Sequence, residues 1–133
     1  MHTISLSHAE TRSISIEATP AAVFAFVADP RNLPRWAPAF ADAVRPAGER
    51  WIVTSGDTEL PISVQASAER GTLDLLGGPD LNVGAFSRVL PNANGSEYLF
   101  TLFFPDGTPQ EAVSAQMQVV EQELETVREL VEG

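Results

Sequence analysis

The stretch Thr108 to Glu132, TPQEAVSAQMQVVEQELETVRELVE, carries the clearest periodic pattern in the chain. Its apolar residues recur at alternating steps of four and three, which places them in one stripe of an α-helix. The stripe consists of Val113, Met117, Val120, Leu124, Val127 and Val131. The opposite face is assigned to solvent and carries Glu121, Glu123, Glu125, Glu129 and Glu132. We therefore expect a long amphipathic helix whose stripe needs a covering surface.

The residues before the stripe predict how this helix begins. Thr108 offers an N-cap oxygen, Pro109 suits the first helical position, and Glu111 would complete a capping box. About 24 residues at 1.5 Å each would extend roughly 36 Å, which is long enough to cross a sheet. We expect strands from the rest of the chain to wrap around the helix and to leave a cavity between them.

Length and charge restrict the classes of protein. With 133 residues we expect a single domain spanning 1–133, in which 1–10 form a loosely ordered leader. The formal charge of −10, from 18 acidic and 8 basic residues, argues against binding to nucleic acid or an anionic membrane surface. No apolar run approaches the length of a membrane span, and no signal peptide is evident. We expect no membrane insertion and a cytoplasmic location.

Missing residue types restrict the chemistry. The chain has no cysteine and no lysine, which excludes disulfides, thiol nucleophiles, Schiff bases and a phosphate-binding P-loop lysine. The two histidines, His2 and His8, both lie in the leader. We therefore expect no metal site and no cofactor, and any catalysis would depend on Asp, Glu, Arg or Tyr98.

The first third of the chain predicts a strand followed by two short helices. Residues 11–18 alternate between polar and apolar, as in a half-buried strand. Thr19 and Pro20 then form an N-cap and a first helical position, and Asp29-Pro30 ends that helix. Pro34 and Pro38 exclude a long second helix but allow a helical elbow that contains Leu33 and Trp36.

The middle of the chain predicts hairpins. A two-residue turn at Gly56-Asp57 would set Trp51 opposite Ile62, and one at Arg70-Gly71 would set Ala68 opposite Leu73. With these registers one apolar face comprises Trp51, Val53, Leu60, Ile62, Val64, Leu73 and Leu75. The strand EYLFTLFF at 97–104 is apolar on both faces, so its inward side stays open.

A few polar side chains are candidates for chemistry. By the expected register Asp74 faces Arg88, either as an exposed cross-strand ion pair or as a polar pair at the cavity that binds a ligand oxygen. Tyr98 either faces outward or orients a bound carbonyl with its hydroxyl. Trp36 and Trp51 are either core anchors or an aromatic gate to the cavity.

This order of elements resembles the START-like superfamily, also called SRPBCC or helix-grip, and within it the polyketide cyclase/dehydrase branch. The resemblance is carried by ISIEATPAAVFAFVADPRNLPRWAPAF at 14–40, with further marks at Trp51, Gly71, Asp74, Arg88-Val89 and 95–102. It implies an α+β helix-grip fold, with a bent seven-stranded antiparallel sheet around the C-terminal helix and two short helices after the first strand. Members of such families bind lipids, sterols, hormones or polyketides, and some catalyse cyclisation, dehydration or hydrolysis.

Three functional hypotheses follow. The first is binding of a lipid-, polyketide- or aromatic-like molecule in the cavity. Its candidate ligand-binding residues are Trp36, Trp51, Val53, Ile62, Val64, Leu75, Val113, Met117 and Val120. The second is a polyketide cyclase or dehydratase in which Asp74, Arg88 or Tyr98 polarises a carbonyl. The third is an interaction module, in which the strand from Tyr98 to Phe104 packs against a second subunit in a homodimer.

Overall fold

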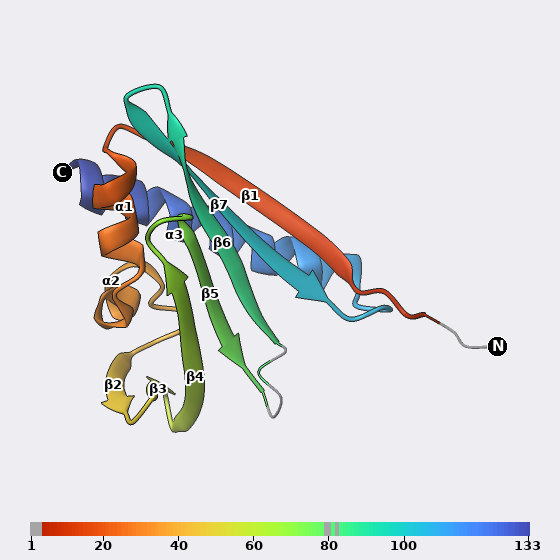
Figure 1. The fold of residues 1–133 in the computed structure, drawn as a ribbon. Helices are drawn as coiled ribbons and strands as arrows, with labels where there is room; N and C mark the ends of the chain where they lie inside the picture. The colour runs from red at the N-terminus through yellow and green to blue at the C-terminus, as the bar shows by residue number, and fades with distance from the viewer. Residues whose placement is uncertain (1–3, 79–80, 82) are drawn as a thin grey trace.

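The computed structural model describes residues 4–78, 81 and 83–133, and its seven strands form one antiparallel sheet that is bent around a long helix (Figure 1). The elements in chain order are β1 (His8–Ile16), α1 (Pro20–Val27), a 3₁₀ turn (Pro30–Asn32), α2 (Leu33–Trp36), β2 (Ala43–Ala47), β3 (Arg50–Ser55), β4 (Thr58–Ser67), β5 (Thr72–Gly77), β6 (Val83–Asn92), β7 (Gly95–Phe104) and α3 (Gln110–Glu132). The strand order across the sheet is β1-β7-β6-β5-β4-β3-β2. This architecture confirms the predicted helix-grip fold.

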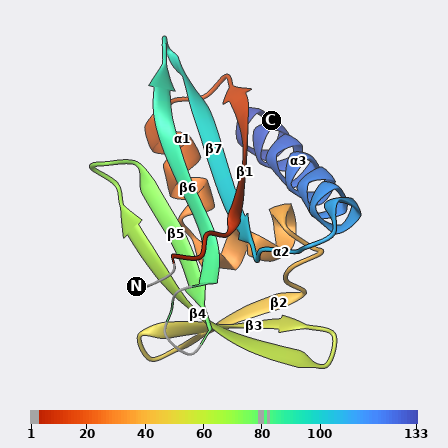
Figure 2. The ribbon, with the colours of Figure 1, turned by 90° about the vertical axis from the view of Figure 1, so that its right-hand side faces the viewer.

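The long helix α3 lies against β1 and β7 on one side of the sheet (Figure 2). Val113, Met117, Val120, Leu124 and Val127 are at most 3% exposed, which confirms the predicted stripe, and Val131 is half-buried. Burying one such side chain contributes about 1.5–3 kcal/mol. Burial of the stripe therefore contributes most of the free energy that holds α3 on the sheet.

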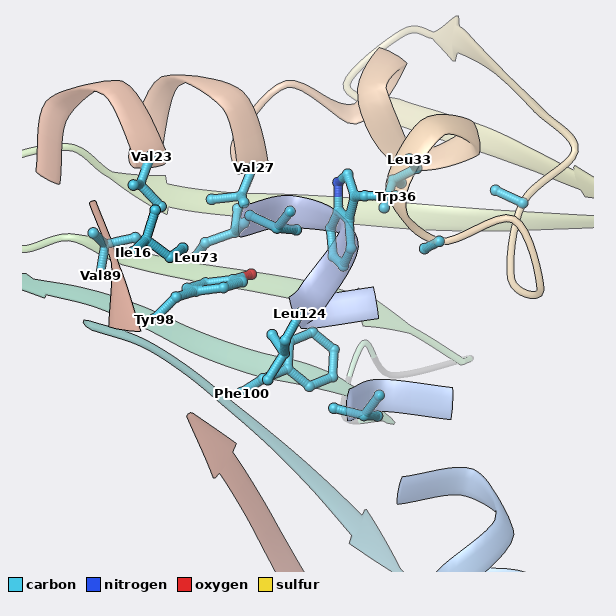
Figure 3. Close-up of a cluster of buried hydrophobic side chains, with 14 of the residues drawn as sticks. Ile16, Val23, Val27, Leu33, Trp36, Leu73, Val89, Tyr98, Phe100 and Leu124 are labelled. Carbon is cyan, nitrogen blue, oxygen red and sulfur yellow. The ribbon is translucent and has the colours of Figure 1, made fainter. Parts of the chain in front are cut away.

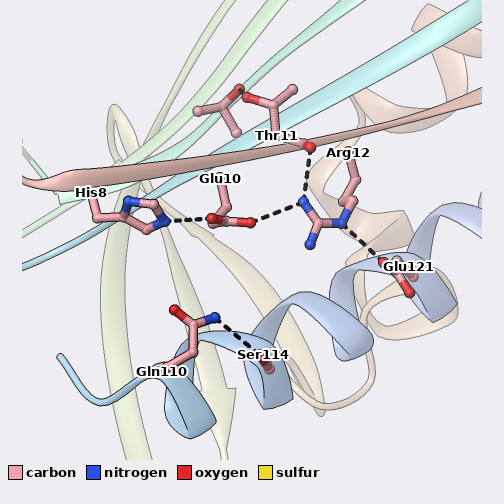
Figure 4. Close-up of polar contacts among 8 residues, drawn as sticks. His8, Glu10, Thr11, Arg12, Gln110, Ser114 and Glu121 are labelled. Carbon is pink, nitrogen blue, oxygen red and sulfur yellow. Dashed lines mark hydrogen bonds and ion pairs between the residues drawn. The ribbon is translucent and has the colours of Figure 1, made fainter.

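Polar contacts also join α3 to β1 and to Glu17, the residue that follows β1. Arg12 donates from Nε to Oε2 of Glu121 at 2.9 Å, and Glu10 and His8 continue this chain of polar side chains along β1 (Figure 4). Near the other end of the helix, the backbone N–H of Glu17 donates to Oε2 of Glu132 at 2.7 Å. These contacts are exposed, so each contributes little to the free energy of folding. Their effect is mainly to fix the position of α3 relative to β1.

The predicted capping box of α3 is wrong. Thr108 donates its hydroxyl to the carbonyl oxygen of Pro105 at 2.6 Å, and its backbone N–H bonds to the same oxygen. The hydroxyl is therefore used to close the preceding turn. The helix begins at Gln110, and Pro109 occupies the N-cap position without a side-chain cap.

The first strand and the two short helices follow the sequence prediction closely. Ala22 donates its backbone N–H to the Thr19 hydroxyl oxygen at 3.2 Å, which confirms that N-cap. Leu33 and Trp36 of the elbow are both buried. The strand begins and ends earlier than the expected 11–18, because residues 8–10 of the expected leader pair with β7 as part of β1 and the strand stops at Ile16. The leader residues 1–3 lie outside the described residues.

The hairpin registers are predicted correctly at one turn and wrongly at the next. Trp51 pairs with Ile62 as expected, but Leu73 pairs with Ala66 and not with Ala68. The second turn has four residues, because Gly71 takes a φ of +70° and donates its N–H to the Ser67 carbonyl oxygen at 2.8 Å. A shift of two residues keeps every side chain on the same face, so the predicted apolar surface survives.

The strand β4 changes partners halfway along its length. Its first half, Thr58 to Ile62, pairs with β3, and its second half, Ser63 to Ser67, pairs with β5. Pro61 lies at the change and has no N–H to donate to the ladder. The β2–β3 hairpin consequently crosses the other strands at a steep angle (Figure 2). This bend makes the sheet concave on the side that faces α2 and α3.

The inward side of β7 is now defined. Ser96, Tyr98 and Phe100 are buried, whereas Phe103 on the opposite side is exposed. The Trp36 and Phe100 rings meet edge to face with centroids 6.4 Å apart, and Tyr98 lies beside them in the buried cluster (Figure 3). The core therefore lies between β7, its neighbouring strands and the three helices.

Candidate functional site

A cavity of about 400 Å³ lies between the bent sheet and the helices α2 and α3. Its wall is almost entirely apolar and consists of Leu33, Trp36, Ala37, Phe40, Leu60, Ile62, Leu75, Gly77, Gly78, Val83, Gly84, Ala85, Phe100, Leu102, Phe103, Phe104, Gln116, Val120 and Glu123. This volume falls in the range of small-molecule sites in proteins.

The space exists because the long helix does not cover the whole sheet. α3 packs on β1 and β7, and in the described part of the chain it makes no comparable contact with β4, β5 or β6. Small residues in β6 also leave room, since Gly84 and Ala85 present almost no side chain. A methyl group at Gly84 would lie 2.0 Å from the carbonyl oxygen of Leu75, so a larger residue there requires the two strands to separate.

The mouth of the cavity is surrounded by exposed apolar side chains. Leu60 and Val83 line the cavity on the inward side of the sheet and are 38% and 65% exposed. They come from β4 and β6, so two strands contribute to one rim. Exposed apolar groups that continue into a cavity are typical of a binding site for an apolar molecule.

Glu123 is the one ionisable side chain among the described residues of the cavity wall. It is only 9% exposed, and burial raises the pKa of its carboxyl to about 7. No hydrogen bond or ion pair from a described residue offsets this cost. The assignment of Glu123 to the solvated face of α3 is therefore wrong.

The sequence does contain a signal for this position. Glu123 follows Val120 by three residues and precedes Val127 by four, which puts it at the edge of the apolar stripe. Gln116 lies at the same edge two turns earlier and also lines the cavity. The two polar side chains thus form one margin of the stripe, and it is this margin that faces the cavity.

The structure divides the predicted ligand-binding residues into two groups. Trp36, Ile62, Leu75 and Val120 line the cavity. The others lie in or against the solid core outside the cavity wall, namely Trp51, Val53, Val64, Val113 and Met117. Sequence reasoning missed the ring-bearing wall residues Phe40, Phe100 and Phe104, because nothing in their strand or loop patterns marks the concave region.

The three catalytic candidates all lie outside the cavity wall. Asp74 pairs with Phe86 and Arg88 pairs with Thr72, so the expected Asp74–Arg88 pairing is wrong by two residues. Arg88 is exposed and lines a separate surface depression beside α1. No ion pair between Asp74 and Arg88 occurs among the described residues.

Tyr98 has a structural hydrogen bond. It is completely buried and donates its hydroxyl to Oγ of Ser87 at 3.2 Å, and Ser87 donates to the carbonyl oxygen of Leu73 at 2.8 Å. Burial raises the pKa of the Tyr98 hydroxyl, and the nearby Glu123 carboxylate raises it further. Tyr98 is therefore a neutral core residue that links β7, β6 and β5.

Two general findings bear on the kind of site. Among the residues that the structure describes, no helix is long and apolar enough to cross a membrane. Within the same residues, no three His, Cys, Asp or Glu side chains are grouped so that they could hold a metal ion.

Comparison with known proteins gives one family and many similar folds. A family model described as "Polyketide cyclase / dehydrase and lipid transport" matches residues 7–132. No curated protein sequence matches the chain.

Several solved structures have the same fold. An uncharacterised protein from Bacillus thuringiensis has a TM-score of 0.73 at 15% identity, over 93% of this chain and 98% of its own. XoxI from Bacillus cereus has a TM-score of 0.72 at 16% identity, over 92% and 94%. The Aha1 dimer from Colwellia psychrerythraea has a TM-score of 0.73 at 12% identity, over 94% and 96%. At these identities the similarity concerns the fold alone.

Proposed function

Because the chain belongs to the polyketide cyclase / dehydrase and lipid transport family, we propose that it binds one small apolar molecule in the cavity between β4–β7 and the helices α2 and α3. The observation that carries this proposal is the combination of an apolar cavity of about 400 Å³ with an exposed apolar rim. A cavity of this kind stabilises an apolar guest by removing its surface from water.

The wall composition favours a ligand that contains rings. Trp36, Phe40, Phe100 and Phe104 come from the elbow, the loop after it and β7, and all four line the cavity. Aromatic side chains interact with ring systems through offset or edge-to-face contacts, which add about 0.5–1.5 kcal/mol to simple burial. An aromatic or polyketide-like molecule therefore suits the cavity better than a flexible chain of the same size.

The enzymatic alternative has less support. Asp74, Arg88 and Tyr98 are separated from the cavity, so none of them is placed to polarise a carbonyl of a bound molecule. The interaction alternative rests on the outward side of β7, where Phe103 and Phe86 pack edge to face with centroids 5.7 Å apart. A homodimer through this face stays a prediction.

The proposal is tested with the uncharged fluorescent probe N-phenyl-1-naphthylamine. The substitution Ala85→Trp puts an indole into the cavity from β6, and we expect it to weaken probe binding at least about tenfold. The matched control Ala66→Trp adds the same ring at an exposed position on β4 and should bind as wild type does. Failure of the wild-type protein to bind the probe, or equal binding by the two variants, would contradict the proposal.

A further inference from the structure

Glu123 stands out in the cavity wall because it has no structural role there. Every other charged side chain of α3 is exposed or half-exposed, whereas Glu123 is buried among apolar groups. A buried carboxylate without a partner destabilises a protein, and a core position that needs only packing is filled better by Leu or Met. The position of this carboxyl therefore points to a partner that comes from outside the chain.

The other polar atoms near the cavity do not supply that partner. The nitrogen of Trp36 has no hydrogen-bond partner, but it is fully buried, so the ring and not the N–H is what a ligand would touch. The Tyr98 hydroxyl already donates to Ser87. Gln116 lies two turns before Glu123 on the same margin of α3 and faces the cavity with it.

We propose that Glu123 is the polar anchor of the cavity and selects apolar ligands whose polar end donates a hydrogen bond, such as a phenol or another hydroxyl, over ligands that end in a carboxylate. This inference rests on the proposed function, because it concerns the ligand of the same cavity. An ionised carboxylate can accept hydrogen bonds but cannot donate them. It therefore pairs with a donor and repels a second carboxylate.

The position of Glu123 would also set the orientation of the ligand. Val120, one turn before it on α3, is apolar, and apart from Gln116 so is the rest of the described wall, so this surface accepts the apolar body of a guest. A hydroxyl that reaches Glu123 leaves the rest of the molecule against β4, β5 and β7. The net charge of −10 adds long-range repulsion of anionic ligands.

Three ligands of similar size and different polar ends test this inference. They are 2-naphthol, 2-methylnaphthalene and 2-naphthoate, and binding is measured by titration at about pH 8, above the pKa of Glu123. For the wild-type protein we expect 2-naphthol to bind about tenfold more tightly than 2-methylnaphthalene, since a hydrogen bond to a charged acceptor is gained. We expect 2-naphthoate to bind most weakly.

Two substitutions at Glu123 separate the acceptor from the charge. Glu123→Leu removes both, so the preference for 2-naphthol should disappear and 2-methylnaphthalene should bind more tightly. Glu123→Gln keeps an acceptor oxygen, so part of the preference for 2-naphthol should remain while the rejection of 2-naphthoate is lost. Glu125→Gln changes the same residue type on the exposed side of α3 and should behave as wild type does.

The outcomes distinguish the two proposals. If 2-methylnaphthalene binds and the order of the three ligands is the same in Glu123→Leu as in wild type, the anchor role of Glu123 is wrong and the binding function stands. If none of the three ligands binds to the wild-type protein, the binding function fails and the anchor role fails with it. Thermal unfolding of each variant checks that it is folded, and removing a buried charge should not lower stability.

Discussion

Glu123 on α3 and Trp36 on α2 line the same cavity, and within the described residues neither the carboxyl nor the indole nitrogen has a hydrogen-bond partner. Helix α2 belongs to the elbow after the first strand, and α3 ends the chain, so the fold brings together two segments that are far apart in sequence. Buried polar groups without partners are uncommon in proteins. Among the described residues the Trp36 nitrogen is the one fully buried side-chain polar atom without a partner, and Glu123 is the one ionisable side chain of the cavity wall, so the chain departs from simple core packing at this cavity.

Glu123 should make stability depend on pH. Burial raises its folded-state pKa from the usual 4.5 to about 7, so between these values the folded protein holds a proton that the unfolded chain releases. Stability should therefore fall as pH rises from about 5 to about 8, by on the order of 1–3 kcal/mol. Urea unfolding at several pH values measures this, and Glu123→Gln should flatten the dependence.

The control for this experiment is Glu125→Gln, which leaves the buried carboxyl in place and should keep the wild-type slope. Tyr98 is a titratable group near Glu123, and it stays neutral over this range because burial raises its pKa. An unchanged slope in Glu123→Gln would show that another group causes the pH dependence.

The apolar stripe should hold α3 far more strongly than the ion pair beside it. Met117 is 1% exposed, so Met117→Ala should cost about 2–5 kcal/mol in the free energy of unfolding. Glu121→Gln removes the exposed pair with Arg12 and should cost about 1 kcal/mol or less. Denaturant unfolding compares the two variants, and a larger loss for Glu121→Gln would contradict this ranking.

The hydrogen bond between Tyr98 and Ser87 should be structural. Tyr98→Phe removes the donor and should cost about 0.5–1.5 kcal/mol. Ser87→Ala should cost more, about 1–3 kcal/mol, because it leaves the buried Tyr98 hydroxyl without an acceptor. A double-mutant cycle measures the coupling between them. Loss of probe binding in a folded Tyr98→Phe protein would instead indicate that this hydroxyl acts on the ligand.

Asp74 and Arg88 should not take part in ligand binding. Both lie outside the cavity wall, so the substitutions Asp74→Asn and Arg88→Ala should change probe affinity by less than about twofold. Titration with N-phenyl-1-naphthylamine measures this, with Ala85→Trp as the variant that should lose binding. A large loss in Arg88→Ala would revive the cyclase or dehydratase alternative.

The fold could be predicted largely because its signals are local. The stripe on α3, the Thr19 cap and the Gly56-Asp57 turn each depend on neighbours in sequence, and the structure has all three. The turn before Thr72 was harder, since Gly71 accommodates either a two-residue or a four-residue loop. The pairing of β4 with β5 therefore differs by two residues from the expected one, without a change of the inward face. The connection between β5 and β6 sets a second register, which also differs by two residues and places Asp74 opposite Phe86.

The site was less predictable, because the cavity lies where the helices do not contact the sheet. That arrangement depends on the tertiary structure, and no local sequence pattern predicts it. Met117 and Val120 look alike in the stripe, yet only Val120 lines the cavity. What separates them is their place on the helix, because Val120 lies beside the margin of Gln116 and Glu123 that faces the cavity, whereas Met117 is packed in the core. Glu123 is hard to predict for another reason. A glutamate on an acidic helix is expected to face solvent unless its position at the edge of the apolar stripe is considered.

The central claim, that a guest molecule occupies the space between the bent sheet and α3, is tested most directly by methyl NMR during titration with 2-methylnaphthalene. The methyl signals of Ile62, Leu75 and Val120 should shift together and saturate at one ligand per protein, because these side chains line the cavity. Those of Val23 and Val127, which are buried in the solid core, should move little. No saturable shift at the first three, or larger shifts at the core pair, would contradict the account.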